Sequence, residues 1–232
     1  MTKRIVCKFG GSSVADATQF QKIKAIVTAD KKRRVIVVSA PGKRNSKETK
    51  LTDLLYSTYD LASKGLDFST PWTLIRERYL GICTDLGIKT HVTDDLNALE
   101  KKLKSQDPDV TTDFLVSRGE FLCARIMAEY LGATFVDAFP MIAFDDRYRV
   151  TAKSYVDIAA SLSDENTLYV VPGFYGSDLQ GQVKTFYVVV LTSQGPFLRM
   201  PLKPRAMKTG PMFLVCSWQT PVLLQEHSPS SM

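Results

Sequence analysis

A lysine and two glycines near the N-terminus are the residues of this chain best suited to bind phosphate. Lys8, Gly10 and Gly11 lie in the segment 8–14 (KFGGSSV), between a short apolar run and an amphipathic segment from about 16 to 27. This pattern predicts a strand, a tight glycine turn and a helix. Two glycines allow backbone conformations closed to other residues, and their N–H groups together with a helix N-terminus form a phosphate site. Lys8 would add a positive charge where the strand ends.

Simpler interpretations of these residues remain open at this level. A Gly-Gly pair between a strand and a helix is often only a connection, and a lone lysine at a strand end is usually solvated. The segment also lacks the Gly-x-x-x-x-Gly-Lys-Ser/Thr pattern of a Walker loop. The residues alone therefore indicate phosphate binding without establishing it.

Length and composition are those of a globular protein. With 232 residues, the chain is long enough to bury a substantial core as one large domain or two small ones. Its 44% hydrophobic and 23% charged residues are ordinary for a soluble protein. No apolar run reaches the roughly 18 residues of a membrane span, and the N-terminus lacks the apolar region of a signal peptide. We therefore expect a cytoplasmic protein that does not associate with membranes.

Cysteine spacing and charge distribution argue against two further classes. The four cysteines are scattered without a Cys-x-x-Cys pair, so we expect reduced thiols and no metal site. The net charge is +6, but residues 187–232 hold four Lys or Arg and one Asp or Glu, which leaves 26 and 23 in residues 1–186. Because the larger part is nearly balanced in charge, we expect no nucleic-acid partner.

The rest of the chain alternates between strand and helix patterns. A β-branched run at 34–40 is typical of a strand buried on both faces, and a polar loop follows it. Helical patterning from 51 to 104 breaks at Gly65 and Gly87, and a further helix is expected at 120–131. The remaining strand candidates lie at 134–137 and 167–171. This alternation predicts a layered α/β fold whose ligands bind at the C-terminal ends of parallel strands.

Four segments in order resemble the aspartokinases. Segment 8–14 is similar to their opening KFGGTSV signature, with Ser12 in place of Thr. Val38 to Ala40, followed by KLTDLL at 50–55, resembles the loop and helix start that hold the amino-acid substrate. SRGE at 117–120 and VVPGFYG at 170–176 resemble the second and third signatures and differ from those of glutamate 5-kinase and uridylate kinase. The resemblance covers residues 1–186 and implies the amino acid kinase fold, a three-layer α/β/α sandwich with a mostly parallel central sheet.

The resemblance also implies an activity. Aspartokinases transfer the γ-phosphoryl group of ATP, bound with Mg²⁺, to the side-chain carboxylate of L-aspartate, the first step of lysine, threonine and methionine biosynthesis. Such chemistry depends on positioning and charge neutralisation. By this likeness Lys8 would be catalytic and stabilise the transferring phosphoryl group, while Phe9, Gly10 and Gly11 would join it in binding the ATP phosphates. Members of this family are homo-oligomers.

Four further residues would hold the aspartate by the same likeness. Ser39 and Thr52 would hydrogen-bond it, Glu120 would bind its α-ammonium group, and Phe174 would shape the pocket. Each also has a structural explanation: Ser39 could be an ordinary strand-end residue, and Thr52 a helix N-cap. Glu120 could be an acidic residue in the first turn of a helix, favoured by the helix dipole, and Phe174 a core residue.

The resemblance stops after Phe186. Aspartokinases continue with FSRGG(S/A)DITG, whose Asp and Arg help to organise the reacting groups, whereas this chain reads FYVVVLTSQG at 186–195. Synonymous codons exist for FSRGGADITG from which the loss of one C yields residues 186–194. The other frame of residues 207–213 can likewise encode the nucleotide-site string ENWTDV, and that of 218–222 can encode MADPR. We infer a reading-frame slip.

The slip leads to three expectations. Residues 1–186 form the N-terminal part of the catalytic domain, and residues 187–232, with six of the eleven prolines and no aspartate, form an out-of-frame tail that is disordered or loosely packed. The chain is truncated and lacks the regulatory ACT domains. It is therefore inactive or nearly so as written. The alternative is a non-catalytic fragment that at most binds a ligand or a partner.

Overall fold

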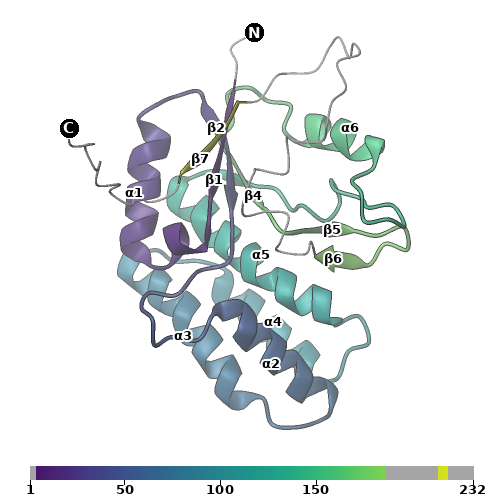
Figure 1. Cartoon of the computed structure of the whole chain (residues 1–232). Helices are drawn as coiled ribbons and strands as arrows, with labels where there is room; N and C mark the ends of the chain where they lie inside the picture. The colour runs from purple at the N-terminus through teal and green to yellow at the C-terminus, as the bar shows by residue number, and fades with distance from the viewer. Residues whose placement is uncertain (1–3, 186–213, 219–232) are drawn as a thin grey trace, which may run out of the picture.

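A parallel sheet forms the centre of the computed structural model, which describes residues 4–185 and 214–218 (Figure 1). Its five strands are ordered β3-β4-β2-β1-β7, and every neighbouring pair is parallel. The strands are β1 (Ile5–Phe9), β2 (Arg33–Val38), β3 (Thr134–Phe135), β4 (Tyr169–Pro172) and β7 (Leu214–Trp218). A separate antiparallel hairpin joins β5 (Tyr175–Ser177) to β6 (Val183–Thr185).

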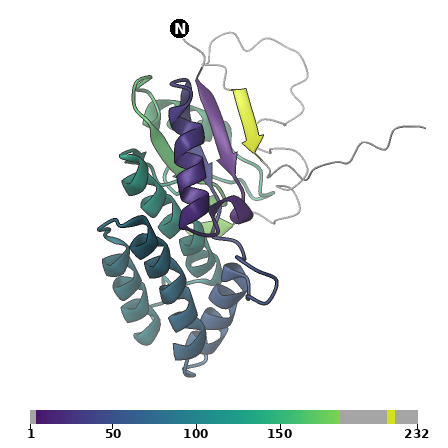
Figure 2. The ribbon, with the colours of Figure 1, turned by 90° about the vertical axis from the view of Figure 1, so that its left-hand side faces the viewer.

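Helices account for most of the remaining described residues. A short 3-10 turn (Gly11–Val14) precedes the first of them. The helices are α1 (Ala17–Thr28), α2 (Leu51–Ser63), α3 (Ser69–Leu86), α4 (Val92–Lys104), α5 (Thr112–Leu131) and α6 (Ala152–Ser161). Helices α2, α3 and α4 lie together beyond one end of the sheet, and the side view shows α1 alongside β1 (Figures 1 and 2).

Both faces of the sheet are covered, because alternate residues of a strand point to opposite sides. One face packs against α1 and α5, and it carries Cys7, Phe9, Ile36, Val38 and Val170. The same core continues through α5 to α2, α3 and α4. The other face packs against α6, β5 and the segment 138–144, and it carries Val35, Tyr169 and Val171. This explains why the strands read as continuous apolar runs. It confirms the predicted layered α/β fold with a mostly parallel sheet.

Local sequence signals set several helix ends as expected. The Asp16 side chain accepts a hydrogen bond from the Gln19 N–H (2.9 Å), and α1 therefore begins at Ala17, within one residue of the prediction. Gly87 and Gly132 end α3 and α5 with φ of 65° and 64°. This left-handed conformation favours glycine, so both predicted helix stops are confirmed.

The expected start of α5 was wrong. The helix begins at Thr112, eight residues before Glu120, and the side chain of Thr111 caps it by accepting from the Phe114 N–H (3.1 Å). The SRGE segment therefore lies in the helix interior, although serine and glycine are weak helix formers. Packing explains the glycine: a Cβ on Gly119 would lie 3.1 Å from the Cβ of Ala40.

Part of the predicted tail belongs to the sheet. Strand β7 lies parallel to β1 from Leu214 opposite Ile5 to Trp218 opposite Phe9 (Figures 1 and 2). The rest of the segment 187–232 lies outside the described residues. The domain boundary at 186 and the disorder of the tail as a whole therefore stay predictions.

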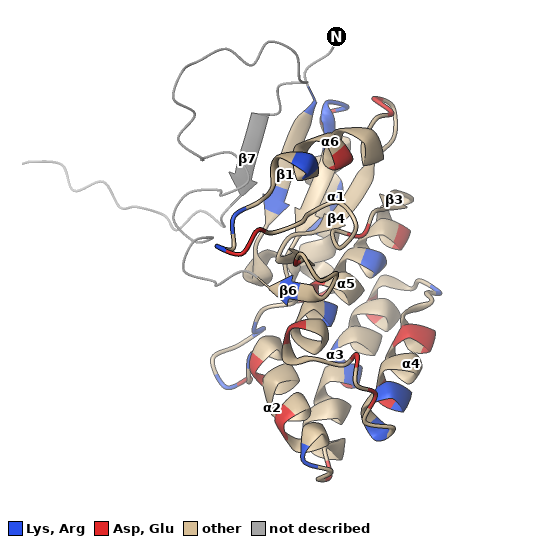
Figure 3. Ribbon diagram, turned by 90° about the vertical axis from the view of Figure 1, so that its right-hand side faces the viewer, with Lys and Arg blue, Asp and Glu red and all other residues tan. Residues whose placement is uncertain are grey.

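Lys and Arg alternate with Asp and Glu along the ribbon, without a large region of one sign (Figure 3). Several are paired one helical turn apart, such as Lys64 with Asp60 and Lys153 with Asp157, each at 2.6 Å. Exposed pairs of this kind contribute about 0–1 kcal/mol each. Among residues 4–185 and 214–218, no helix is both long and apolar enough to cross a membrane.

Two glycines test the packing in opposite directions. A Cβ on Gly176 in β5 would lie 2.4 Å from the Ile142 carbonyl oxygen, whereas one on Gly81 within α3 would meet nothing within 4 Å. We expect Gly176→Ala to lower the free energy of unfolding by about 1–3 kcal/mol. Gly81→Ala should raise it by up to ~1 kcal/mol through helix propensity. Urea denaturation measures both, and equal stabilities of the two variants would contradict this packing.

Candidate active site

Three loops meet where the central strands end (Figure 1). Gly10 follows β1, Ser39 follows β2 and Gly173 follows β4, and these three strands are neighbours in the parallel sheet. Parallel strands bring their C-terminal ends to one edge, which is where ligands bind in open α/β sheets. The glycine turn, the loop after β2 and the loop after β4 therefore open at the same edge of the sheet.

The glycine turn is needed for space rather than for an unusual backbone conformation. Gly10 has an extended conformation with φ of −77°, and neither it nor Gly11 is among the glycines with positive φ. A Cβ on Gly10 would meet nothing within 4 Å, so open space lies beside it. A Cβ on Gly11 would lie 3.1 Å from the Ala40 carbonyl oxygen. A small ligand group therefore has room at Gly10, while Gly11 lets the next loop approach.

The two residues before the turn differ in what they offer a ligand. Lys8 is partly buried in β1, and its positive charge acts on Glu120. Phe9 is only 1% exposed and packs in the core, and its carbonyl oxygen accepts from the Ser39 N–H (3.1 Å). The Phe9 side chain is therefore not available to a ligand, and only its backbone could take part in phosphate binding.

A buried carboxyl group lies at the centre of the site. Glu120, in the middle of α5, is only 7% exposed, and its Oε2 accepts from the Gly173 N–H (2.8 Å). The Ser39 side chain and the Ala40 backbone also hydrogen-bond to it. The interpretation of Glu120 as a first-turn helix acid is wrong, because α5 begins eight residues earlier. The structure thus brings Lys8, Ser39 and Glu120 together, while their contacts with a ligand stay predictions.

Burial controls the charge of this carboxyl group. It raises the pKa of Glu120 from 4.5 to about 8, although the hydrogen bonds from Gly173, Ser39 and Ala40 and the charge of Lys8 favour the ionised form. The effect of burial is larger because the free-energy cost of removing water from a carboxylate exceeds the stabilisation that these partners provide. Glu120 is therefore mostly protonated at neutral pH. A cationic ligand would favour its ionised form.

Thr52 is partly buried in the first turn of α2, and Phe174 follows Gly173 in the chain. The α2 helix begins at Leu51 with Lys50 at the N-cap position, so the interpretation of Thr52 as an N-cap is wrong. The first turns of α2 reach the residue before Glu120, since a Cβ on Gly119 would lie 3.0 Å from Leu55 Cδ1. Phe174 is 9% exposed and belongs to the core, next to Gly173. Contacts of Thr52 and Phe174 with a ligand stay predictions.

Sequence reasoning gave no role to Arg118, the second residue of the SRGE segment. Its buried guanidinium lies over the rings of Phe114, Phe121 and Tyr175, at 4.7, 4.5 and 5.2 Å from the ring centres. Stacking of this kind favours arginine over lysine. Arg118 thus joins α5 to β5. Two aromatic residues at helical spacing around the arginine were the signal for it.

The residues present fit the phosphate groups of a nucleotide better than a protein-bound metal ion. Gly10 offers open space and Lys8 a positive charge. Within the part of the chain that the structure describes, no three His, Cys, Asp or Glu side chains lie close enough to hold a metal.

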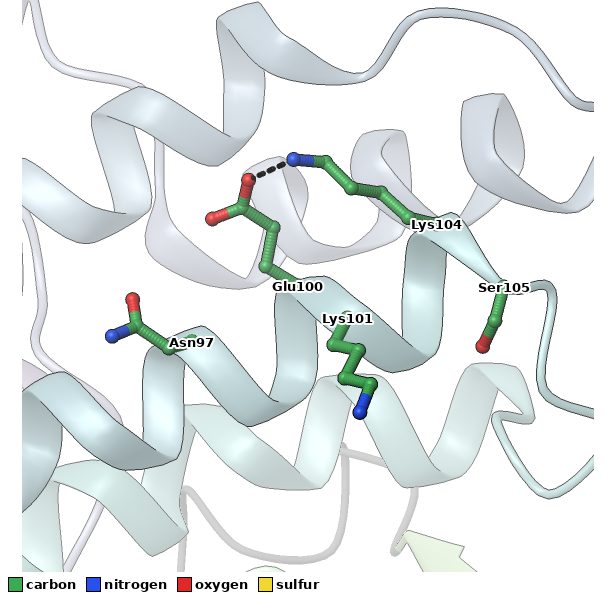
Figure 4. Close-up of a pocket in the computed structure, with 5 residues that line it drawn as sticks. All are labelled: Asn97, Glu100, Lys101, Lys104 and Ser105. Atoms are coloured by element: carbon green, nitrogen blue, oxygen red, sulfur yellow. Dashed lines mark ion pairs between the residues drawn. The ribbon is translucent and has the colours of Figure 1, made fainter.

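A hollow of about 470 Å³ lies elsewhere, on α4 (Figure 4). It is lined by Asn97, Glu100, Lys101, Lys104 and Ser105. Lys104 and Glu100, one turn apart on α4, form an ion pair at 2.6 Å (Figure 4). None of these residues belongs to the loops at the strand ends, and this hollow is not part of the candidate site.

Comparisons with known proteins agree with this geometry. Residues 3–193 match the amino acid kinase family. Aspartokinase 3 of Bacillus subtilis is 33% identical over 194 residues, which cover 78% of this chain and 42% of that protein. The crystal structure of Clostridium acetobutylicum aspartate kinase has a TM-score of 0.75 at 41% identity, over 80% of this chain and 42% of that one. The crystal structure of Escherichia coli aspartokinase III in complex with aspartate and ADP has a TM-score of 0.64 at 26% identity. This match covers 79% of this chain and 43% of that one.

The chain belongs to the amino acid kinase family, because the family match covers most of its length. Within that family it is similar to aspartokinases, and its fold is that of the aspartate kinase structures. It spans about two fifths of the length of these relatives.

The pKa of Glu120 makes stability depend on pH. Because its folded-state pKa of about 8 exceeds the ordinary 4.5, the folded protein binds this proton more tightly than the unfolded chain. The contribution is fully present below pH 4.5 and is lost as pH rises to 8, by at most about 1.4 kcal/mol per pH unit. Relative to Glu120→Gln, we expect the wild type to lose stability over this range.

Chemical denaturation at half-unit pH steps measures this difference. Glu77→Gln, which changes an exposed glutamate of α3, is the matched control and should track the wild type. A constant difference between the wild type and Glu120→Gln from pH 5 to 8 would show that Glu120 ionises at its ordinary pKa.

Proposed function

We propose that this site binds L-aspartate and the phosphate groups of ATP, as in an aspartate kinase. The observation that carries the proposal is the buried Glu120 carboxyl group, held by Gly173 and Ser39 beside Lys8 at the ends of three parallel strands. Its surroundings provide an acceptor for a cation and a positive charge for an anion within one cluster. An amino acid with a second carboxylate matches both.

The α-ammonium group of aspartate supplies the missing cation. It donates to Glu120, whose proton then leaves, and the resulting ion pair removes most of the cost of a buried charge. Ser39 and Thr52, at the two ends of the loop after β2, hydrogen-bond the substrate. Phe174 limits the pocket on the side of β4. The solved structure of E. coli aspartokinase III with aspartate and ADP supports this choice of ligands.

Lys8 and the glycine turn act on the phosphate side. Backbone N–H groups at Gly10 and Gly11 bind phosphate oxygens, and Lys8 neutralises charge on the phosphoryl group as it moves. An oxygen of the aspartate side-chain carboxylate attacks the γ-phosphorus, and the bond to the β-phosphate oxygen breaks. The products are 4-phospho-L-aspartate and ADP. This reaction is the first step of lysine, threonine and methionine synthesis.

We also propose that the chain as written does not complete this reaction. After Phe186 its sequence departs from the FSRGG(S/A)DITG motif that the resemblance associates with the reacting groups. Ligand binding by the part before Phe186 and catalysis by the whole site are therefore separable. A protein that binds aspartate without phosphorylating it is the second candidate function, and the departing sequence is the observation that favours it.

Aspartate binding predicts a ligand-specific gain in thermal stability. We expect L-aspartate at millimolar concentration to raise the melting temperature of the wild type, because it binds the folded state only. Succinate, which has both carboxylates but no ammonium group, should not. Glu120→Gln should abolish the response to aspartate, while Glu77→Gln should keep it. An equal response to aspartate and succinate would exclude the proposed role of Glu120.

Catalysis is tested separately with ATP, Mg²⁺ and aspartate. We expect no aspartate-dependent formation of ADP, and no acyl phosphate trapped by hydroxylamine, from the purified 232-residue chain. Turnover that is lost in Lys8→Ala would show that the chain is a competent kinase and that the departure after Phe186 does no harm.

A further inference from the structure

A buried arginine on α3 holds the polar loop that follows β2. The sequence of this loop, residues 41–50, is almost entirely polar and predicts few anchors. In the structure Arg78 is only 7% exposed, and its Nη1 donates to the Gly42 carbonyl oxygen (2.8 Å). Its Nη2 pairs with Glu48 Oε2 at 2.8 Å. One guanidinium thus binds the beginning and the end of the loop.

The loop closes on itself around the same carboxylate. Glu48 Oε2 also accepts from the Arg44 N–H (2.7 Å), and its Oε1 accepts from Arg44 Nε (2.6 Å). The Glu48 side chain is 14% exposed, whereas Lys43, Arg44 and Lys47 are exposed. Loop residues therefore turn basic side chains to solvent and their one acidic side chain inward to Arg78.

Gly42 connects this anchor to the glycine turn. Its N–H donates to the Gly11 carbonyl oxygen (2.8 Å), while its own carbonyl accepts from Arg78. A Cβ on Gly42 would lie 2.6 Å from the Gly11 carbonyl carbon, so the two backbones touch. A continuous path of hydrogen bonds thus runs from α3 through the loop to the turn proposed to bind phosphate.

The next residue of α3, Tyr79, contacts the helix α5 that carries Glu120. Tyr79 is fully buried, and its hydroxyl donates to the Gly119 carbonyl oxygen (2.6 Å), one residue before Glu120. Arg78 and Tyr79 therefore reach the two sides of the candidate site from one turn of one helix, although neither is among the residues predicted to contact a ligand.

We propose that Arg78 is a positioning residue that holds the 41–50 loop against the Gly10–Gly11 turn. Ser39 and Thr52 flank the two ends of this loop, so anchoring it fixes both. The claim about aspartate rests on the proposed function, whereas the claim about the loop does not. Arg78 is not among the residues proposed to contact the substrate.

Trypsin reports the state of the loop without any ligand, because Lys43, Arg44 and Lys47 are exposed cleavage sites within it. We expect Arg78→Gln to increase cleavage at these sites about tenfold, the change that ~1.4 kcal/mol in the free energy of opening produces. Glu48→Gln should act in the same direction without altering the buried arginine. Arg78→Lys, which can reach one partner at a time, should give an intermediate rate.

Arg76→Gln is the matched control. Arg76 also lies on α3 and pairs with a glutamate, Glu100, at 3.5 Å, but that pair is not connected to the loop. Cleavage sites identified by mass spectrometry separate loop opening from global unfolding. Loop cleavage at the wild-type rate in both Arg78→Gln and Glu48→Gln would overturn the anchoring claim.

The rise in melting temperature with aspartate tests whether the anchoring of the loop by Arg78 matters for ligand binding. We expect about tenfold more aspartate to be needed for the same rise in melting temperature in Arg78→Gln, partial recovery in Arg78→Lys, and no change in Arg76→Gln. Faster loop cleavage with an unchanged aspartate response would contradict the positioning role. A wild type that does not respond to aspartate contradicts the proposed function instead, and the trypsin result then stands by itself.

Discussion

The hydrogen bond from the Gly173 N–H to Glu120 is the interaction around which the site is built. It joins residues 53 positions apart, one in the loop after strand β4 and one in the middle of α5. Glycine favours it, because a Cβ on Gly173 would lie 2.7 Å from Val37 Cγ1 and one of the two would have to shift. The contact holds a carboxyl group out of water with too few partners to keep it ionised. Such a group has a high affinity for either a proton or a cationic ligand.

The fold supplies the support that this carboxyl group needs. Neighbouring parallel strands bring Lys8, Ser39 and Gly173 to one edge, and helices on one face fill the space beneath them. Behind the ligand-facing residues, Arg78 and Tyr79 fix the loop and the helix that carry the polar groups. Groups that are already ordered need not be ordered when a ligand arrives, so these supports reduce the entropic cost of binding.

Much of the fold could be predicted from local sequence, and little of the site could. The strand, turn and helix around Gly10 and the helix stops at Gly87 and Gly132 follow from apolar periodicity and glycine chemistry. The start of α5 could not, because tertiary packing around Gly119 outweighs weak helix propensity. The charge state of Glu120 depends on groups from three distant segments, and the anchor from Arg78 to Gly42 spans 36 positions. Only the family resemblance pointed to Glu120 beforehand.

The most direct test is the number of protons exchanged when aspartate binds. Titration calorimetry at pH 7 in two buffers with different protonation enthalpies gives this number. If Glu120 is buried and protonated until the α-ammonium group replaces the proton, nearly one proton is released to the buffer per aspartate bound. Binding of aspartate with the same enthalpy in both buffers would contradict the account.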